Sequence, residues 1–364
     1  MNMNHFPKLY IQLFFFYTIA VCLAVFSGCK QIEPERIVKV ITDSITEITI
    51  NSAISGGNIL DDGGEPINIR GVCWNTSGNP TIQNYDGITA NGSGDGRFKS
   101  IISGLTDGTT YYVRAYATNS NGTRYGDEIG FIAFECGNSI ISDYDGNEYH
   151  TIQIGNQCWM KENLKATHYS DGTPIQLVVN KSAWSDLMKD EKAYCSYENS
   201  SSSLDVYGAL YNWEAAMNNE PSSAANPSGR KGVCPDGWHL PSDDEWKELE
   251  SYLGMSPSDA DKIWSRGTNE GGQLKETGTS HWQSPNEGAT NSSGFTALPG
   301  GYRLGNGDFS SIGNYASFWT STMNWDYQYL CPWIRSLSHD RSDIHRGNQN
   351  TEDRGLSVRC LMDD

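Results

Sequence analysis

The sequence predicts an all-β sandwich followed by a separate α+β domain. Of the 11 tryptophans only Trp74 lies before residue 158, so two differently built domains share the 364-residue chain, which is longer than one ordinary core requires. Over residues 36–134, short runs of alternating apolar and polar residues are separated by turns rich in Gly, Asn and Asp, as in an antiparallel sandwich. Over residues 138–362, strand-like runs are interrupted by segments with the apolar spacing of helices.

An export signal precedes both domains. Residues 1–8 carry the basic Lys8, residues 9–26 are almost unbroken apolar, and Ser27 and Gly28 supply small residues before a cleavage point. The apolar stretch is also close to the length that spans a bilayer, so an uncleaved anchor helix is the alternative interpretation. Either interpretation places the rest of the chain outside the cytoplasm.

The end of this signal, Ser27-Gly28-Cys29, resembles the lipobox of bacterial lipoproteins. In that family the cysteine sulfur is acylated with diacylglycerol and becomes the mature N-terminus. The resemblance implies a signal peptide over residues 1–28, lipidation of Cys29, a tether over residues 29–35, and attachment to the membrane through the acyl chains on Cys29. It implies a cell-envelope location as an outer-membrane lipoprotein, and two glutamates close behind Cys29 favour exposure at the cell surface.

The charge balance excludes one class of partner. The chain carries 26 Lys and Arg against 44 Asp and Glu, for a net charge of −18. Such a chain repels nucleic acid and anionic lipid headgroups, so no nucleic-acid partner is expected.

The first domain, residues 36–134, is expected to consist of strands near residues 67–74, 98–102, 111–117 and 128–134. Within it, Leu105 to Ala117 resembles the E–F region of fibronectin type III domains, and Tyr111 falls at the tyrosine-corner position, where the hydroxyl bonds to upstream backbone. The resemblance implies a fibronectin type III-like sandwich that acts as a spacer. Cys73 is expected to be a buried, unpaired thiol.

The second domain, residues 138–362, carries an ordered series of motifs at residues 155–164, 207–213, 234–241, 294–303, 318–322 and 357–360. The series resembles the Fibrobacter succinogenes major paralogous domain of exported bacterial proteins. The same motifs resemble the C-type-lectin-like fold of sulfatase-modifying enzymes and variable bacterial receptors. The resemblance therefore implies an α+β C-type-lectin-like domain.

Local signals place three elements in this domain. Ser242 and Glu245 form a capping box at the start of a helix with Trp246 and Leu249 on one face. A second helix is expected over residues 207–217, and a strand over residues 355–361.

The cysteines suggest structural disulfides. Cys234, before the Ser242 helix, and Cys360, on the last strand, could tie that helix to the sheet, and Cys136 and Cys158 could close the domain entrance. Connectivity does not follow from sequence, so these pairings remain open.

The late cysteines are the feature that an enzymatic role would need. Sulfatase-modifying enzymes use a late cysteine pair with bound copper to oxidise a substrate cysteine, and Cys331 and Cys360 are the late cysteines here. A disulfide at Cys360 is the simpler interpretation, and no nucleophile elbow or phosphate-binding loop is present. We therefore expect a protein that is not an enzyme and needs no cofactor.

Two polar clusters could bind a metal. Residues 339–345 would place His339, Arg341, Asp343 and His345 on one side of a strand, but the arginine disfavours a cation. The turn after Asp143 lacks the glycine and glutamate of a calcium-binding helix–loop–helix site, so a tight turn is expected. No metal site is predicted.

The sequence offers one aromatic candidate for ligand binding. Trp325, Tyr327 and Tyr329 recur at the period of a strand and would share one face, beside amide and carboxylate groups. Such a face suits a sugar or a protein partner, although it could also be core. We therefore expect a non-catalytic recognition domain for a glycan or surface protein, with a structural or adhesive envelope role and a sulfatase-modifying-type oxidase as alternatives.

Overall fold

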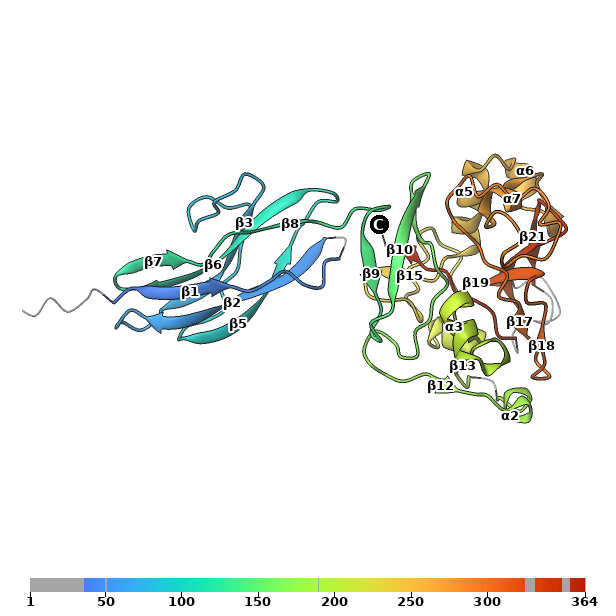
Figure 1. Ribbon diagram of the computed structural model, residues 1–364, viewed down its shortest axis with the longest axis horizontal. Coiled ribbons are helices and arrows are strands. Elements are labelled where there is room, and N and C mark those ends of the chain that lie inside the picture. The colour runs from blue at the N-terminus through green and yellow to red at the C-terminus, as the bar shows by residue number, and fades with distance from the viewer. Residues whose placement is uncertain (1–35, 50, 189, 325–330, 349–353, 364) are drawn as a thin grey trace, which may run out of the picture.

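The computed structural model describes residues 36–49, 51–188, 190–324, 331–348 and 354–363 (Figure 1). The signal peptide, Cys29, the tether, and the aromatic candidates Trp325, Tyr327 and Tyr329 lie outside these residues. They stay predictions.

The first domain is a β-sandwich. Its strands are β1 (Val38–Thr42), β2 (Ser52–Asp62), β3 (Ile69–Asn75), β4 (Gly87–Ile88), β5 (Gly96–Ser103), β6 (Thr110–Asn119), β7 (Gly122–Tyr125) and β8 (Ile129–Ile132). Within the described residues one sheet has the order β1-β2-β5, and the other has the order β4-β3-β6-β7, with β8 also paired to β6. All of these pairings are antiparallel, as the alternating runs predict.

Alternation along the strands builds the sandwich core. On β5, Phe98 and Ile102 are buried while their neighbours are not. The backbone N–H of Thr106 donates to Oη of Tyr111 at 3.2 Å, which is the tie expected of a tyrosine corner. Cys73 is a buried free thiol, and burial raises its pKa to about 11. This thiol is therefore an inert core group.

The sandwich runs directly into the second domain. Phe134, just beyond β8, packs edge-on against Trp238 of the second domain, with ring centroids 6.1 Å apart. A disulfide joins Cys136 to Cys158 at the same place.

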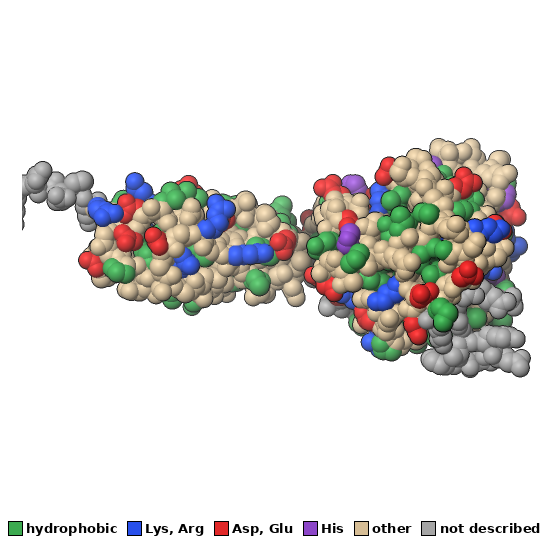
Figure 2. All heavy atoms as spheres, turned by 90° about the horizontal axis from the view of Figure 1, so that it is seen from below, with side chains coloured by type: hydrophobic (Ala, Val, Ile, Leu, Met, Phe, Trp, Pro, Cys, Tyr) green, Lys and Arg blue, Asp and Glu red, His purple; other side chains and the backbone are tan. Residues whose placement is uncertain are grey.

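Acidic and basic side chains are interspersed on the face of the molecule that Figure 2 shows.

The second domain is α+β. Its strands are β9 (Ile140–Ser142), β10 (Glu148–Ile154), β11 (Gln157–Met160), β12 (Gln176–Leu177), β13 (Ala193–Cys195), β14 (Leu210–Tyr211), β15 (Trp238–His239), β16 (Trp264–Arg266), β17 (Tyr302–Arg303), β18 (Phe309–Ser310), β19 (Tyr315–Asn324), β20 (Cys331–Ser338), β21 (Ile344–Gly347) and β22 (Leu361–Met362). Its helices are α2 (Lys181–Ser185), α3 (Ser201–Tyr207), α4 (Trp213–Met217), α5 (Asp243–Tyr252), α6 (Pro257–Ala260) and α7 (Glu270–Leu274), with a short 3-10 turn η1 (Tyr197–Asn199).

Two of its sheets organise the domain. Among the described residues, one has the order β15-β22-β11-β10-β9, and the other has the order β16-β21-β20-β19. Smaller groups are β12-β13-β14 and β17-β18. Figure 1 shows α5, α6 and α7 gathered at one corner, beside β21.

The α5 prediction is confirmed. Ser242 accepts from the backbone N–H of Glu245, and the Glu245 carboxylate accepts from the backbone N–H of Ser242. Trp246 and Leu249 are buried, and the Trp246 ring lies 5.6 Å from the ring of Phe318 on β19. A local capping signal therefore positions the helix against the sheet.

The prediction of one helix over residues 207–217 is wrong. Helix α3 ends at Tyr207, and Gly208 follows with φ +79°. A side chain at Gly208 would meet the Leu164 carbonyl oxygen at 2.9 Å, so this position needs both the backbone freedom and the small size of glycine. The chain then forms β14, and Asn212 caps the separate helix α4.

The strand expected over residues 355–361 is much shorter. Only Leu361–Met362 forms the strand β22. Before it, Gly355, Leu356 and Ser357 make isolated bridges to Arg303, Tyr211 and Phe318, respectively, in three different strands. The apolar alternation therefore reflects a segment that crosses between sheets.

A second disulfide joins Cys234 to Cys360, next to β22. The two disulfides are the pairs that the sequence favoured. Disulfides persist in oxidising compartments, so they indicate a location outside the cytoplasm. No helix within the described ranges is long and apolar enough to span a bilayer.

Candidate functional site

The sheet β16-β21-β20-β19 has two chemically different faces. The helix face carries Phe318, Arg335, Leu337, Ile344 and Arg346, which lie toward α5 and its neighbours. The cavity face carries the alternate residues Tyr315, Ser317, Ile334, Ser336 and His345. Because side chains alternate along a strand, one sequence pattern supplies both faces.

The helix face contains a buried network of ion pairs. Arg335 donates to a carboxylate oxygen of Asp243 at 2.8 Å and to one of Glu250 at 2.6 Å, while Arg346 donates to Asp243 at 2.6 Å. Arg266 on β16 completes the network with Glu250 at 2.5 Å. Burial alone would raise the pKa of Asp243, but the Arg335 and Arg346 guanidinium groups hold it well below its usual range. Three strands are thus locked to α5.

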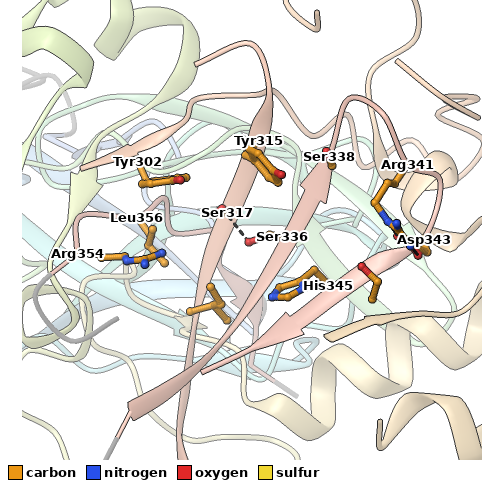
Figure 3. Close-up of a pocket in the computed structure, with 12 residues that line it drawn as sticks. Tyr302, Tyr315, Ser317, Ser336, Ser338, Arg341, Asp343, His345, Arg354 and Leu356 are labelled. Atoms are coloured by element: carbon orange, nitrogen blue, oxygen red, sulfur yellow. Dashed lines mark hydrogen bonds and ion pairs between the residues drawn. The ribbon is translucent and has the colours of Figure 1, made fainter. Parts of the chain in front are cut away.

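The cavity face borders a hollow of about 240 Å³ (Figure 3). Its floor is made by Ser317 and Ser336, whose hydroxyl oxygens are 2.8 Å apart in a hydrogen bond. The rings of Tyr302 and Tyr315 stand beside this floor in Figure 3, and His345 points toward it from β21. The cavity therefore has polar and apolar lining in about equal parts, is bordered by aromatic rings and is partly open.

One end of the cavity is formed by the turn between β20 and β21. Arg341 donates from Nε to Asp343 at 2.9 Å and makes a second, shorter contact with the same carboxylate. The buried Lys275 holds this turn: its Nζ donates to the carbonyl oxygens of Ser338, Arg341 and Glu287 at 2.8 Å each. Lys275 therefore fixes the position of this end of the cavity.

Tyr302 and Arg354 form the other end. The Arg354 guanidinium lies over the Tyr302 ring, 5.5 Å from the centroid. The Tyr302 hydroxyl accepts a hydrogen bond from the Ser311 hydroxyl at 3.3 Å. A cation stacked on an aromatic ring is oriented without being neutralised.

The environment of His345 favours the uncharged form of its imidazole. Burial lowers its pKa, and the positive charge of Arg266 lowers it further. The Trp264 ring lies 5.6 Å from the His345 ring. Trp264 is 44% exposed and has φ +70°, a backbone conformation that is unusual for so large a residue.

The cavity contains the components of a hydrolytic relay, but they are not linked. Ser336 and His345 are partners on adjacent strands, and Asp343 is near. However, the Ser336 hydroxyl bonds to Ser317 and the Asp343 carboxylate is held by Arg341. The arrangement suits binding of hydroxyls and of a charged group more than nucleophilic attack.

The polar cluster predicted over residues 339–345 is divided. Arg341, Asp343 and His345 line the cavity, but His339 instead contacts the Ser284 carbonyl oxygen through Nδ1 at 3.1 Å. The strand spacing fails because β20 ends at Ser338 and a turn follows. In the described part of the chain, no group of three or more His, Cys, Asp or Glu side chains could hold a metal ion.

The turn after Asp143 is the expected tight turn. Asp143 accepts hydrogen bonds from the Asn147 backbone N–H at 3.0 Å and from the Tyr149 hydroxyl at 2.7 Å. Its carboxylate thus stabilises the connection between β9 and β10.

The late cysteines do not form the pair that the oxidase alternative needs. Cys360 is bonded to Cys234, and Cys331 is a buried free thiol.

The Fibrobacter succinogenes major domain matches residues 152–362, which is more than half of the chain. The chain belongs to this family. The matched region of the Fibrobacter succinogenes major domain includes the whole cavity and the ion-pair network behind it. None of the curated proteins compared with the chain matches it.

Solved structures similar to the chain cover about the length of its sandwich. A sensor domain of the anti-sigma factor RsgI4 of Pseudobacteroides cellulosolvens is 16% identical, with 27% of this chain and 95% of that chain covered and a TM-score of 0.21. A fibronectin type III domain of the human KIAA0970 protein is 11% identical, with 28% and 77% covered and a TM-score of 0.21. Such low scores add nothing to what the two sheets already establish.

Several cavity residues were not among the sequence candidates. They are Tyr302, Tyr315, Ser317, Ser336 and Arg354. The available signal was the alternation of Tyr315 and Ser317 with buried Ala316 and Phe318, which marks a two-sided strand. This alternation does not tell which face of the strand a helix covers.

Proposed function

We propose that this protein is an exported recognition protein whose Fibrobacter succinogenes major domain binds a saccharide without covalent chemistry. The observation that carries the proposal is the cavity, which combines two tyrosine rings with a floor of serine hydroxyls. Sugar rings present apolar C–H faces and hydroxyl edges, and these match aromatic rings and hydrogen-bonding groups, respectively. The neutral His345 imidazole can both donate and accept a hydrogen bond.

Two further features support a binding role. The ion-pair network on the helix face gives the cavity a rigid base, which lowers the entropy lost on binding. The exposed Trp264, held at positive φ beside His345, has the strained backbone that often marks a functional position.

The wider architecture belongs to the same proposal. Acyl chains on Cys29 would anchor the protein at the outer membrane, and the sandwich would act as a spacer that holds the domain away from it. The domain would have a C-type-lectin-like fold. Trp325, Tyr327 and Tyr329 remain a separate prediction from the sequence.

A glycan array with the full chain tests the proposal. We expect saturable binding to a restricted set of saccharides, and a loss of up to about tenfold in Tyr315→Ala, because packing against one aromatic ring is worth about 0.5 to 1.5 kcal/mol. Tyr252→Ala is the matched control, since this tyrosine is 66% exposed at the end of α5 and does not line the cavity.

Uniformly blank arrays with folded protein would contradict saccharide recognition and favour the adhesive alternative. Turnover of an ester or glycoside substrate that is lost in Ser336→Ala would contradict the absence of covalent chemistry.

A further inference from the structure

The arginines of the second domain differ in how their charge is used. Five of them are buried and direct their guanidinium groups at carboxylates, side-chain amides or backbone carbonyls; they are Arg266, Arg303, Arg335, Arg346 and Arg359. Arg341 is paired with Asp343. The charges of these residues are therefore already engaged within the protein.

Arg230 and Arg354 are different, and of these two only Arg354 is among the described residues that line the cavity. Within the described residues Arg354 has neither a carboxylate partner nor a hydrogen bond from its guanidinium group. The Tyr302 ring orients the cation without neutralising it. No described residue therefore accepts a hydrogen bond from the five guanidinium N–H donors of Arg354.

The other described residues of the cavity lining do not compensate this charge. The charged side chains among them are Arg341 and Asp343, which pair with each other. The described lining of the cavity therefore carries a net positive charge, in a chain whose net charge is −18. A local positive site favours an anionic group as its ligand.

We propose that the cavity binds an acidic saccharide, with the carboxylate or sulfate of one sugar residue on Arg354. This inference rests on the proposed saccharide-binding function and names its ligand class. A planar guanidinium can bind a carboxylate or a sulfate through two parallel hydrogen bonds. The ring that carries the anionic group would then lie near Tyr302, and its hydroxyls would face Ser317 and Ser336.

The experiment uses the full chain on an array of oligogalacturonides, sulfated glycosaminoglycan fragments and neutral galacto- and gluco-oligosaccharides. The best acidic binder is then titrated beside its neutral counterpart, in which the carboxyl is reduced or the sulfate removed. We expect the acidic form to bind at least about tenfold more tightly, as a charge-assisted bidentate pair implies. Comparing the carboxylated with the sulfated saccharides shows which of the two anionic groups binds to Arg354.

Arg354→Gln should abolish this preference while retaining weak binding of the neutral form. Arg124→Gln is the matched control, because Arg124 is an exposed arginine of the sandwich without a carboxylate partner among the described residues, and it should keep the preference. Equal binding of acidic and neutral forms, or a preference that persists in Arg354→Gln, overturns this inference and leaves the proposed function standing. Binding of no saccharide overturns the proposed function itself.

Discussion

The two faces of the sheet β16-β21-β20-β19 use the same strands for opposite purposes. Arg335 and Ser336 are adjacent on β20, yet Arg335 is saturated by two buried carboxylates, while Ser336 lies on the floor of an open cavity. Charged groups on the helix face are paired within the protein, whereas Arg354 at the cavity has no carboxylate partner among the described residues. One side of the sheet therefore fixes the geometry, and the other side borders the cavity that we propose as the binding site.

The largest effect is expected from breaking the helix face. Arg335→Met should lower the free energy of unfolding by about 3 to 5 kcal/mol, because it leaves Asp243 and Glu250 buried without one of their partners. Urea denaturation followed by tryptophan fluorescence measures this loss. A loss below about 1 kcal/mol, the size of an exposed ion pair, would show that the network does not lock the sheet.

Lys275 should couple the two faces. Lys275→Met removes the donor of three backbone carbonyls, and each unsatisfied carbonyl costs about 1 kcal/mol or more, so we expect a loss of about 2 to 4 kcal/mol. Since two of these carbonyls belong to Ser338 and Arg341, saccharide affinity should fall as well. If the folded variant binds the saccharide with unchanged affinity, Lys275 does not couple the two faces.

The free energy of unfolding should depend on pH through His239, whereas saccharide affinity should not. His239 lies between the carboxylates of Glu245 and Asp363, at 2.7 Å from each. Burial alone would lower its pKa, but these two partners raise the pKa to about 9. The stabilisation is therefore complete below about pH 6.5 and is lost as the pH rises through 9, on the order of 1 to 3 kcal/mol.

Urea midpoints at pH 6, 7.5 and 9.5 measure this loss. His239→Gln should flatten the curve over that range, while a wild-type stability that rises toward pH 9.5 would contradict the assignment. Saccharide affinity should not follow the same curve, because His239 does not line the cavity.

The smallest effect on stability is expected on the cavity face. Ser336→Ala removes one hydrogen bond to Ser317 and should cost only about 1 kcal/mol, in contrast to its neighbour Arg335. The same change should weaken saccharide binding measurably by titration calorimetry. A stability loss as large as that of Arg335→Met would erase the distinction between the faces.

The sequence predicts those parts of the fold that local signals determine. The capping box at Ser242 and Glu245 locates α5, and the tyrosine corner at Tyr111 locates a turn of the sandwich, because each uses residues only a few positions apart. The break at Gly208 was missed because it depends on Leu164, which is distant in the sequence.

The cavity could not be predicted in the same way. It needs Tyr302, Ser336 and Arg354 to come together from separate segments, and this depends on strand pairing and register. The sequence grouped Arg341, Asp343 and His345 correctly on one side, but it could not show that a turn removes His339 from them. Alternation marks a two-sided strand, and only tertiary packing decides which side is covered.

The most direct test of the cavity as a saccharide site is an NMR titration of the histidine imidazole signals in the full chain, with a saccharide identified on the array. The signal of His345 should shift saturably, with the dissociation constant found by calorimetry, while that of the exposed His150 beside Glu162 stays in place. A saccharide that binds with the same constant but leaves His345 unmoved would contradict the assignment of the cavity.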